Sequence, residues 1–183
     1  MGAYLSCIIT AKNRNDPKLK DLLYSIEQQT YRNFEILIIT EGNSETAKTI
    51  GLKRTKGNII CILASDNYLN DKEFFEKCLE PLKDESLVGS FPLRYWYYKN
   101  DNILNRYFAL FGVNDPIPFY LKKNDRYSYL NKIKNDSPYW IIYFNFIPTL
   151  GDNGFFIRKD ILIQADIEHY FHIDVCQDLF NLG

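Results

Sequence analysis

The sequence predicts an α/β fold: a Rossmann-like, mostly parallel sheet flanked by helices, with a smaller and less regular second half. Short apolar runs alternate with helical patterns over about the first 90 residues, which is typical of a parallel sheet covered by helices on both faces. The chain has 183 residues, of which 46% are apolar, enough for one domain with a substantial core. Its 9 Gly and 7 Pro exclude a collagen-like or low-complexity chain.

Strands are predicted in the first half wherever an unbroken apolar run ends at a polar segment. These runs cover residues 5–10, 34–39 and 58–63. Runs without polar alternation are expected for strands that are buried on both faces of a parallel sheet. The carboxyl ends of the strands should therefore meet at one edge of the sheet.

Helical patterns lie between and after these strands. The first begins at Pro17, because proline is favoured at the first position of a helix, and its apolar residues recur three or four positions apart. A second, short helix ends near Gly57, and a third covers residues 71–82. The order of strands and helices predicts a βαβαβ arrangement up to about residue 90.

The second half, about residues 91–183, is less regular. Its patterns predict strands over 87–98, 140–147 and 154–158, helices over 103–111, from Asp160 and over 174–182, and a loop over 112–123. We expect a single domain made of two halves that divide near residue 90. Because the chain stops straight after a helical pattern, we expect it to be the N-terminal part of a longer protein.

Charge and cysteine content narrow the class of protein. The 22 basic and 23 acidic residues give a net charge of -1, which provides no electrostatic footprint for non-specific nucleic-acid binding. Cys7 and Cys61 lie in apolar runs and no C-x-x-C pair occurs, so reduced thiols are expected. The sequence has no secretory signal and no apolar run of about 20 residues. We expect a cytoplasmic protein, with any contact to the inner face of a membrane made through residues outside this chain.

The strand ends are the expected place for chemistry, because ligands of open α/β sheets bind there. After the third strand, Asp66 supplies a carboxylate that can hold Mg²⁺ or Mn²⁺ against phosphate oxygens, although aspartate is also a common turn residue. The sequence has no G-x-G-x-x-G, P-loop or G-x-S-x-G motif. A dinucleotide dehydrogenase, a P-loop NTPase and a serine hydrolase are therefore disfavoured. The remaining common function of such a half is to bind a nucleotide at the strand ends without these loops.

Several segments of the first half together match one family. They are IITAKNR at 8–14, LYSIEQQTYRNFEIL at 23–37, ITEGNS at 39–44, AKTIG at 47–51 and KGNIICILASDN at 56–67. This set resembles the donor-binding half of the family 2 glycosyltransferases, which have the GT-A fold. The second segment resembles the family pattern L-x-S-I-x-x-Q-T-Y-x-N-x-E-I-I along its whole length. The resemblance implies a GT-A fold with a nucleotide-sugar donor half and a smaller acceptor half.

The resemblance implies donor-binding roles at the strand ends. Thr10 and Asn13 fall where the family's first strand meets the nucleotide. Glu41 falls on an acidic position whose carboxylate binds the base. Ser65 and Asp66 fall in the D-x-D segment, whose last Asp coordinates the metal that bridges the diphosphate. A donor site with Asp66 as metal ligand is thus implied.

Three positions depart from the family pattern. Lys48 stands at the family's Arg, where a cation suits ribose or phosphate contacts but lacks the bidentate guanidinium fork. Thr40 and Ala64 replace the first Asp of the acidic pair and of D-x-D. Many family members keep only the final Asp as a direct metal ligand, so the resemblance still implies a metal on Asp66.

The second half resembles the family more loosely. The segment PTLGDNGFFIRK at 148–159 resembles the entry to the acceptor region, which implies that Asn153 and Gly154 contact the acceptor; an ordinary loop is the alternative. Asp174 lies where the family carries its general base, and His172 is expected to bind the metal or the pyrophosphate. The alternatives are a helix N-cap for Asp174 and a core or surface position for His172.

These implied roles predict an inverting glycosyltransferase. It would move a sugar, with Mg²⁺ or Mn²⁺, from a nucleotide-diphosphate donor to a hydroxyl of a glycan or lipid-linked glycan, in polysaccharide or cell-envelope biosynthesis. UDP is the expected nucleotide. Two alternatives stay open: a nucleotidyltransferase, disfavoured because residues 12–14 lack glycine, and a non-catalytic nucleotide-sugar-binding or protein-interaction module, which Ala64 favours.

Overall fold

A computed structural model describes residues 4–92, 96–111, 134–136, 139–141 and 153–164 of the chain. These residues belong to two compact units. The first unit contains Met1–Phe91 and Asp152–Phe171, and the second contains Pro92–Gly151 and His172–Gly183. The first unit is therefore discontinuous in the sequence.

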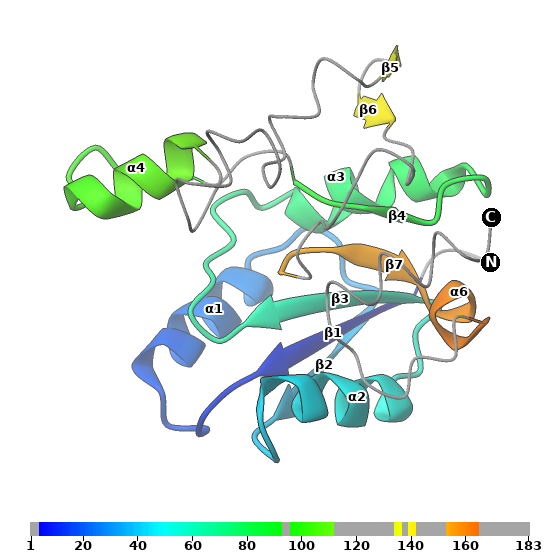
Figure 1. Ribbon diagram of the computed structural model, residues 1–183, viewed down its shortest axis with the longest axis horizontal. Helices are drawn as coiled ribbons and strands as arrows, with labels where there is room; N and C mark the ends of the chain where they lie inside the picture. The colour runs from blue at the N-terminus through cyan, green and yellow to red at the C-terminus, as the bar shows by residue number, and fades with distance from the viewer. Residues whose placement is uncertain (1–3, 93–95, 112–133, 137–138, 142–152, 165–183) are drawn as a thin grey trace. The chain divides into compact units, whose positions relative to one another are not determined.

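A five-stranded sheet forms the centre of the first unit, with the strand order β2-β1-β3-β7-β4 (Figure 1). β1 pairs in parallel with β2 and with β3, whereas β7 is antiparallel to β3 and β4. The predicted fold class, an α/β fold with a mostly parallel sheet flanked by helices, is confirmed. The strands are β1 (Leu5–Thr10), β2 (Phe34–Ile39), β3 (Ile59–Ala64), β4 (Gly89–Ser90) and β7 (Phe156–Arg158).

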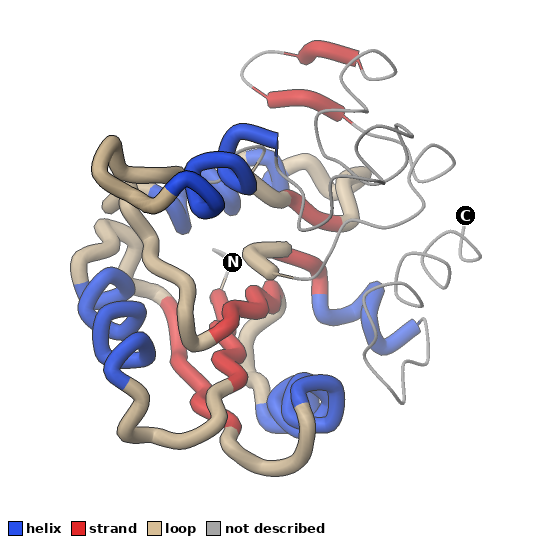
Figure 2. The backbone as a smooth tube through the Cα atoms, turned by 60° about the vertical axis from the view of Figure 1, so that its left-hand side comes forward, coloured by secondary structure: helices blue, strands red, loops and turns tan. Residues whose placement is uncertain are grey.

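Helices lie on both faces of this sheet (Figure 2). On one face, apolar residues of α1 and α3 form a core with Leu5 and Ile9 of β1. On the other face α2 lies so close to β1 that a Cβ added at Gly51 would come within 2.5 Å of the Ile8 side chain. Successive strand residues point to opposite faces, so α2 lies opposite α1. The helices of this unit are α1 (Pro17–Glu27), α2 (Ser44–Arg54), α3 (Phe74–Leu79) and α6 (Lys159–Gln164), with a 3₁₀ turn at Pro81–Lys83.

Aromatic rings complete the core on the side of α1 and α3. Phe156 of β7 is fully buried, and its ring lies edge-on to Phe74 and Phe75, with centroid separations of 5.7 and 6.0 Å. Phe75 makes a further edge-on contact with Phe34 of β2 at 5.5 Å. Such edge-to-face pairs stabilise a core beyond the area they bury.

Helix caps set where α1 and α2 begin. Asp16 is the N-cap of α1, and its side chain accepts the backbone N–H of Lys18 at 3.0 Å. Asn43 is the N-cap of α2, and its side chain accepts the N–H of Thr46 at 2.9 Å. Gly42, just before it, has a φ of 74°, a conformation that favours glycine. Both helices therefore begin within a few residues of a strand end, at the predicted ligand edge of the sheet.

The second unit contributes one described helix and a pair of short strands. α4 (Ile103–Phe111) confirms the helix predicted over these residues. β5 (Lys134–Asp136) pairs antiparallel with β6 (Tyr139–Ile141). Within the described ranges, no helix is long and apolar enough to cross a membrane.

Several predicted elements are shorter than the sequence suggested. The strand predicted over 87–98 is limited among the described residues to Gly89–Ser90, because Pro92 has no N–H to donate to a neighbouring strand. The helix predicted over 71–82 begins only at Phe74, since the Asp71 side chain accepts the N–H of Glu73 at 2.9 Å in a turn.

The remaining elements of the second half are described only in part. Of the strand predicted over 140–147, residues 140–141 lie in β6, and the rest lies outside the described residues. The strand predicted over 154–158 begins at Phe156, after Gly154 with a φ of 73°. The loop predicted over 112–123 and the helix over 174–182 lie outside the described residues.

Candidate functional site at the carboxyl ends of the strands

The backbones directly after β1 and β3 are joined by a hydrogen bond. The N–H of Ser65 donates to the carbonyl of Thr10 at 3.2 Å, and the N–H of Ala11 donates to the carbonyl of Ile39 at 3.0 Å. The parallel pairing of the three strands thus extends to their last residues. The structure places the predicted donor-binding residues Thr10 and Ser65 side by side.

A segment from far along the sequence closes over the end of β3. The N–H of Gly154 donates to the carbonyl of Ile62 at 2.8 Å. The side-chain oxygen of Asn153 accepts the N–H of Ala64 at 3.2 Å, which the side chain of Asn67 also accepts at 3.0 Å. Asn153 and Gly154 therefore lie at the same strand end as Ser65, and their contact with an acceptor stays a prediction.

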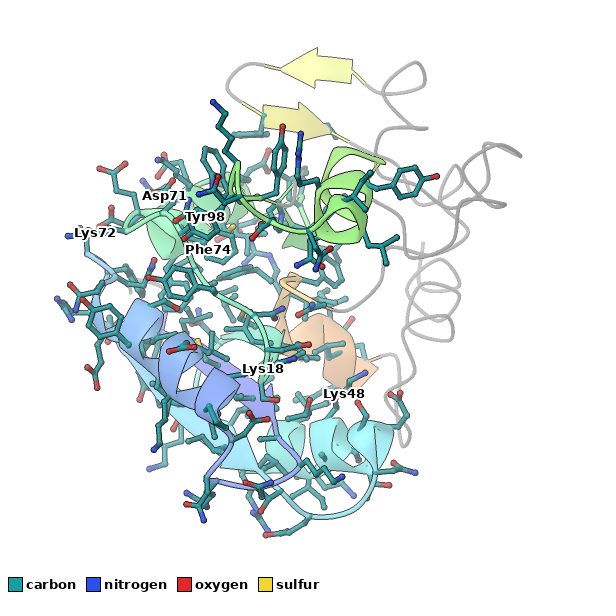
Figure 3. The ribbon with its side chains drawn as sticks, turned by 90° about the vertical axis from the view of Figure 1, so that its left-hand side faces the viewer. Lys18, Lys48, Asp71, Lys72, Phe74 and Tyr98 are labelled. Carbon is teal, nitrogen blue, oxygen red and sulfur yellow. The ribbon has the colours of Figure 1, made fainter. Side chains whose placement is uncertain are left out.

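Asp66, the predicted metal ligand, extends into solvent just beyond β3. Its side chain is 58% exposed, and its carboxylate lies 3.9 Å from the ammonium group of Lys18, a residue labelled in Figure 3. Lys18 is in the first turn of α1, the helix that follows β1. Lys18 lies between two of the segments that match the family pattern, so the resemblance assigns it no role. Its position in the first turn of a helix that starts at a strand end is the signal that would have found it.

Glu41 lies after β2 and is paired with a residue that the sequence did not single out. Both carboxylate oxygens accept from the guanidinium group of Arg54, at 3.3 and 3.0 Å. The two side chains are about half exposed, so the pair is weak. Each carboxylate oxygen has lone pairs to spare for a further donor. Glu41 is thus oriented from the far end of α2, and its role toward a base stays a prediction.

Lys48 is buried in α2, whereas Asn13 is exposed in the turn after β1. Lys48, in α2, is only 6% exposed, and its ammonium group lies 3.0 Å from the carboxylate of Glu45 (Figure 3). The side chain of Asn13 accepts the N–H of Asn15 at 2.9 Å, which forms the turn between β1 and α1. Both donor contacts stay predictions.

The longest family-like segment has a structural role. The hydroxyl of Ser25, in α1, accepts the N–H of Leu69 at 3.1 Å. The fully buried amide of Gln29 donates to the carbonyl of Asp71 at 2.8 Å and accepts the N–H of Phe75 at 3.1 Å. These bonds hold part of the segment after β3, from Leu69 to Phe75, against α1 and the turn that follows α1. Ser25 and Gln29 of the motif therefore have structural roles.

A second network fixes the opposite edge of the sheet. The carboxylate of Glu35 accepts from the Ser6 hydroxyl and from the N–H of Lys56, both at 2.6 Å, and Ser6 in turn accepts the N–H of Gly57 at 2.8 Å. Burial raises the pKa of Glu35, but the hydrogen bond from Ser6 and those from the backbone outweigh it, so its pKa lies below the ordinary value. This network ties β2, β1 and the turn before β3.

The described cysteines lie in the interior. Cys7, Cys61 and Cys78 are buried and unbridged. Cys7 and Cys61 are register partners on β1 and β3, and burial, reinforced by Cys7, raises the pKa of the Cys61 thiol well above its ordinary value. A buried thiol of this kind is unreactive. The reduced thiols predicted for Cys7 and Cys61 agree with this structure.

Among the described residues, Asp66 is the main candidate ligand for a metal ion. In the described ranges no group of three His, Cys, Asp or Glu side chains is placed to hold a metal ion. Mg²⁺, however, is commonly bound through one or two carboxylates, with waters and substrate phosphates completing its shell. The exposed carboxylate of Asp66 fits that mode. Asp174 and His172, the predicted base and second ligand, lie outside the described residues.

Comparisons with known proteins place the fold. No protein-family model and no curated protein matches the sequence. Among solved structures, TarS 1–349 of S. aureus matches with a TM-score of 0.60 and 12% identity, over 96% of this chain and 54% of that chain. TarS in complex with UDP gives a TM-score of 0.58 at 12% identity, over 96% of this chain and 54% of that chain. TarS in complex with UDP-GlcNAc gives 0.59 at 12% identity, over 97% and 53%.

The likeness concerns the fold, since only 12% of the residues are identical. This chain spans about half the length of the TarS structures that it matches, at 54% of the first. The chain shares its α/β fold, with a mostly parallel five-stranded sheet flanked by helices, with these TarS structures.

Proposed function

We propose that the chain is an inverting, family 2 glycosyltransferase that moves a sugar from a nucleotide-diphosphate donor to a hydroxyl acceptor. UDP is the nucleotide that we expect in the donor. The observation that carries the proposal is the meeting of Thr10, Ser65, Asp66 and Asn153 at the carboxyl ends of β1 and β3, in a fold shared with TarS structures that hold UDP and UDP-GlcNAc. In open α/β sheets this edge is where ligands bind.

The donor half of the proposal assigns one role to each strand end. Thr10 and Ser65 contact the nucleotide after β1 and β3, and Glu41 accepts an N–H of the base after β2. Asp66 holds Mg²⁺ or Mn²⁺, which when bound neutralises charge on the leaving diphosphate. Asn13 and Lys48 complete the donor contacts.

The acceptor half rests on residues of the second part of the sequence. Asp174 takes the proton from the acceptor hydroxyl as its oxygen attacks the anomeric carbon, while the bond from that carbon to the diphosphate breaks. A single displacement of this kind inverts the configuration. His172 supports the metal or the pyrophosphate. We propose a glycan or lipid-linked glycan of the cell envelope as the acceptor, reached from the cytoplasm.

A thermal-shift panel with UDP-, GDP-, CDP- and dTDP-sugars, with and without Mn²⁺, tests the donor half. A ligand that binds only the folded state adds about 2.7 kcal/mol of stability at 100 times its dissociation constant. We expect a clear rise in melting temperature with a UDP-sugar and Mn²⁺. If none of the four donors raises it, the proposal is wrong.

Ala64 favours a second candidate, a non-catalytic nucleotide-sugar-binding module of the same fold. It replaces a carboxylate at the end of β3 and leaves Asp66 as the candidate metal ligand among the described residues there. The enzyme and the binding module differ in whether the chain turns over the nucleotide-sugar donor. Donor hydrolysis or sugar transfer above the uncatalysed rate supports the enzyme, and donor binding without either supports the module.

A further inference from the structure

Lys18 belongs to none of the matching motifs, yet it lies beside the predicted metal ligand. Resting on the function proposed above, we infer that Lys18 binds the diphosphate of the nucleotide donor. Its ammonium group is 3.9 Å from the Asp66 carboxylate, and its side chain is 69% exposed. It can therefore reach a ligand that arrives at the same strand end.

The proximity of the two side chains is set by their elements. The start of α1 is fixed by Asp16, whose carboxylate accepts the N–H of Lys18 at 3.0 Å. Ser25 lies seven residues further on, about 10 Å along the helix, and accepts the N–H of Leu69, three residues after Asp66. Gln29 adds two bonds to the same segment. These hydrogen bonds thus fix the segment after Asp66 relative to α1, and with it the distance between Asp66 and the first turn of the helix.

The charges of Asp66 and of the diphosphate explain why the Lys18 ammonium group would favour donor binding at this strand end. An ionised Asp66 alone repels a diphosphate, which carries two negative charges in a nucleotide sugar. With Lys18 beside it the pair is neutral, and a divalent cation together with the diphosphate leaves the cluster neutral again. An exposed ion pair at 3.9 Å contributes little free energy. Lys18 can therefore leave Asp66 and bind a phosphate oxygen with only a small loss of free energy.

Three other described cations of the first unit are paired more closely with carboxylates. Each of these ammonium or guanidinium groups lies within 3.0 Å of a carboxylate: Lys48 with Glu45, Arg54 with Glu41, and Lys77 with Asp71 and Glu73. Lys18 instead faces the carboxylate that the metal would take. With Asp66 holding a metal ion, the Lys18 ammonium group would be available to the phosphates of the donor.

Binding measurements with UDP, UMP and uridine test the inference on the full chain, in Mn²⁺ and in EDTA. Lys18→Met should weaken UDP binding about tenfold or more, the value of one lost charge-assisted hydrogen bond. Uridine binding should change by less than about twofold, because uridine carries no phosphate. Lys18→Arg should restore most of the UDP affinity. The matched control is Lys20→Met, an exposed lysine two positions along α1 and therefore on another side of the helix.

The outcomes separate the inference from the function on which it rests. If wild type binds UDP and Lys18→Met binds it equally well, the inference is overturned. It is also overturned if Lys18→Met weakens UDP and uridine alike, because the residue then acts on the fold. If wild type binds neither UDP nor uridine, the proposed function itself fails.

Discussion

Asp66 is a single exposed carboxylate at the end of a buried strand, and it makes the metal hypothesis directly testable. Asp66→Ala should remove the dependence of donor affinity on Mn²⁺ while the melting temperature stays near wild type, because the ion pair between Asp66 and Lys18 is exposed. Titration of a UDP-sugar in Mn²⁺ and in EDTA measures this. Asp21→Ala, another exposed acidic residue of this region, is the control. Equal donor affinity of wild type in Mn²⁺ and EDTA contradicts the metal role.

Glu41 gives a prediction about the base. A carboxylate accepts the N–H of uracil or guanine, whereas N3 of cytosine bears no proton, so UDP and GDP should bind more tightly than CDP. Arg54→Met removes the ion-pair partner and should leave this order unchanged. Competition binding of the three diphosphates measures it, and tighter binding of CDP than of UDP would exclude the assigned role.

Asp174 carries the catalytic claim. Proton removal by a carboxylate contributes about 10²–10⁴-fold in rate, so Asp174→Asn, which loses basicity but keeps its shape, should lower turnover by about that factor with donor affinity and melting temperature near wild type. As an N-cap, Asn serves about as well as Asp, and only Asp174→Ala would then cost about 1 kcal/mol of stability. Turnover and melting temperature of both variants decide between the two roles. An Asp174→Asn variant with wild-type turnover ends the assignment.

At the scale of elements, Glu35 links β2 to β1 and to the turn before β3 through Ser6, Lys56 and Gly57. Its pKa in the folded protein lies below the ordinary value of a glutamate, because hydrogen bonds from Ser6 and the backbone outweigh the effect of burial, so its charge stabilises the fold at neutral pH. This contribution is lost as the pH falls from about 5 through the folded pKa.

Glu35→Gln keeps an acceptor oxygen but not the charge. The free energy of unfolding of wild type should exceed that of the variant at pH 7, and the difference should shrink toward zero at low pH, where Glu35 is protonated. Denaturant unfolding between pH 3 and 7 measures both proteins. A difference that stays constant over this range contradicts the assigned charge effect.

The elements of the first half were predictable because their signals are local. The strand over 34–39 was read from its apolar run, and the start of α1 at Pro17 from a residue that fits the first helical position. The shortened α3 was missed because Asp71 holds a turn whose partner, Gln29, lies 42 residues away. Lys18 and Arg54 lie outside the segments that match the family, and the fold brings each of them to its carboxylate.

At the scale of the whole molecule, the least predictable feature is the strand order. β7 enters the sheet between β3 and β4 although the whole of Pro92–Gly151 separates it from the first stretch of its unit. Local periodicity predicts a strand near Phe156 but cannot say with which strand it pairs. Its burial beside Phe74 and Phe75 shows that the core of the first unit needs it.

A chain that ends at Phe91 should therefore not fold, although it contains all three parallel strands. It lacks Phe156 and Ile157, both fully buried, and Arg158, whose guanidinium group donates to the carbonyls of Leu82, Asp84 and Leu87. Phe156→Ala in the full chain should by itself cost about 3–5 kcal/mol, a large part of the 5–15 kcal/mol typical of a domain.

Thermal melting followed by far- and near-UV circular dichroism compares this shortened chain and Phe156→Ala with the full chain. We expect the shortened chain to lose its near-UV signal and cooperative transition, and Phe156→Ala to keep both at a lower melting temperature. Ile163→Ala changes an exposed apolar residue of α6 and should melt like wild type, because little apolar area is uncovered there. Cooperative melting of the shortened chain near the temperature of the full chain would show that the parallel strands and their helices are sufficient, and that β7 is an accessory to this fold.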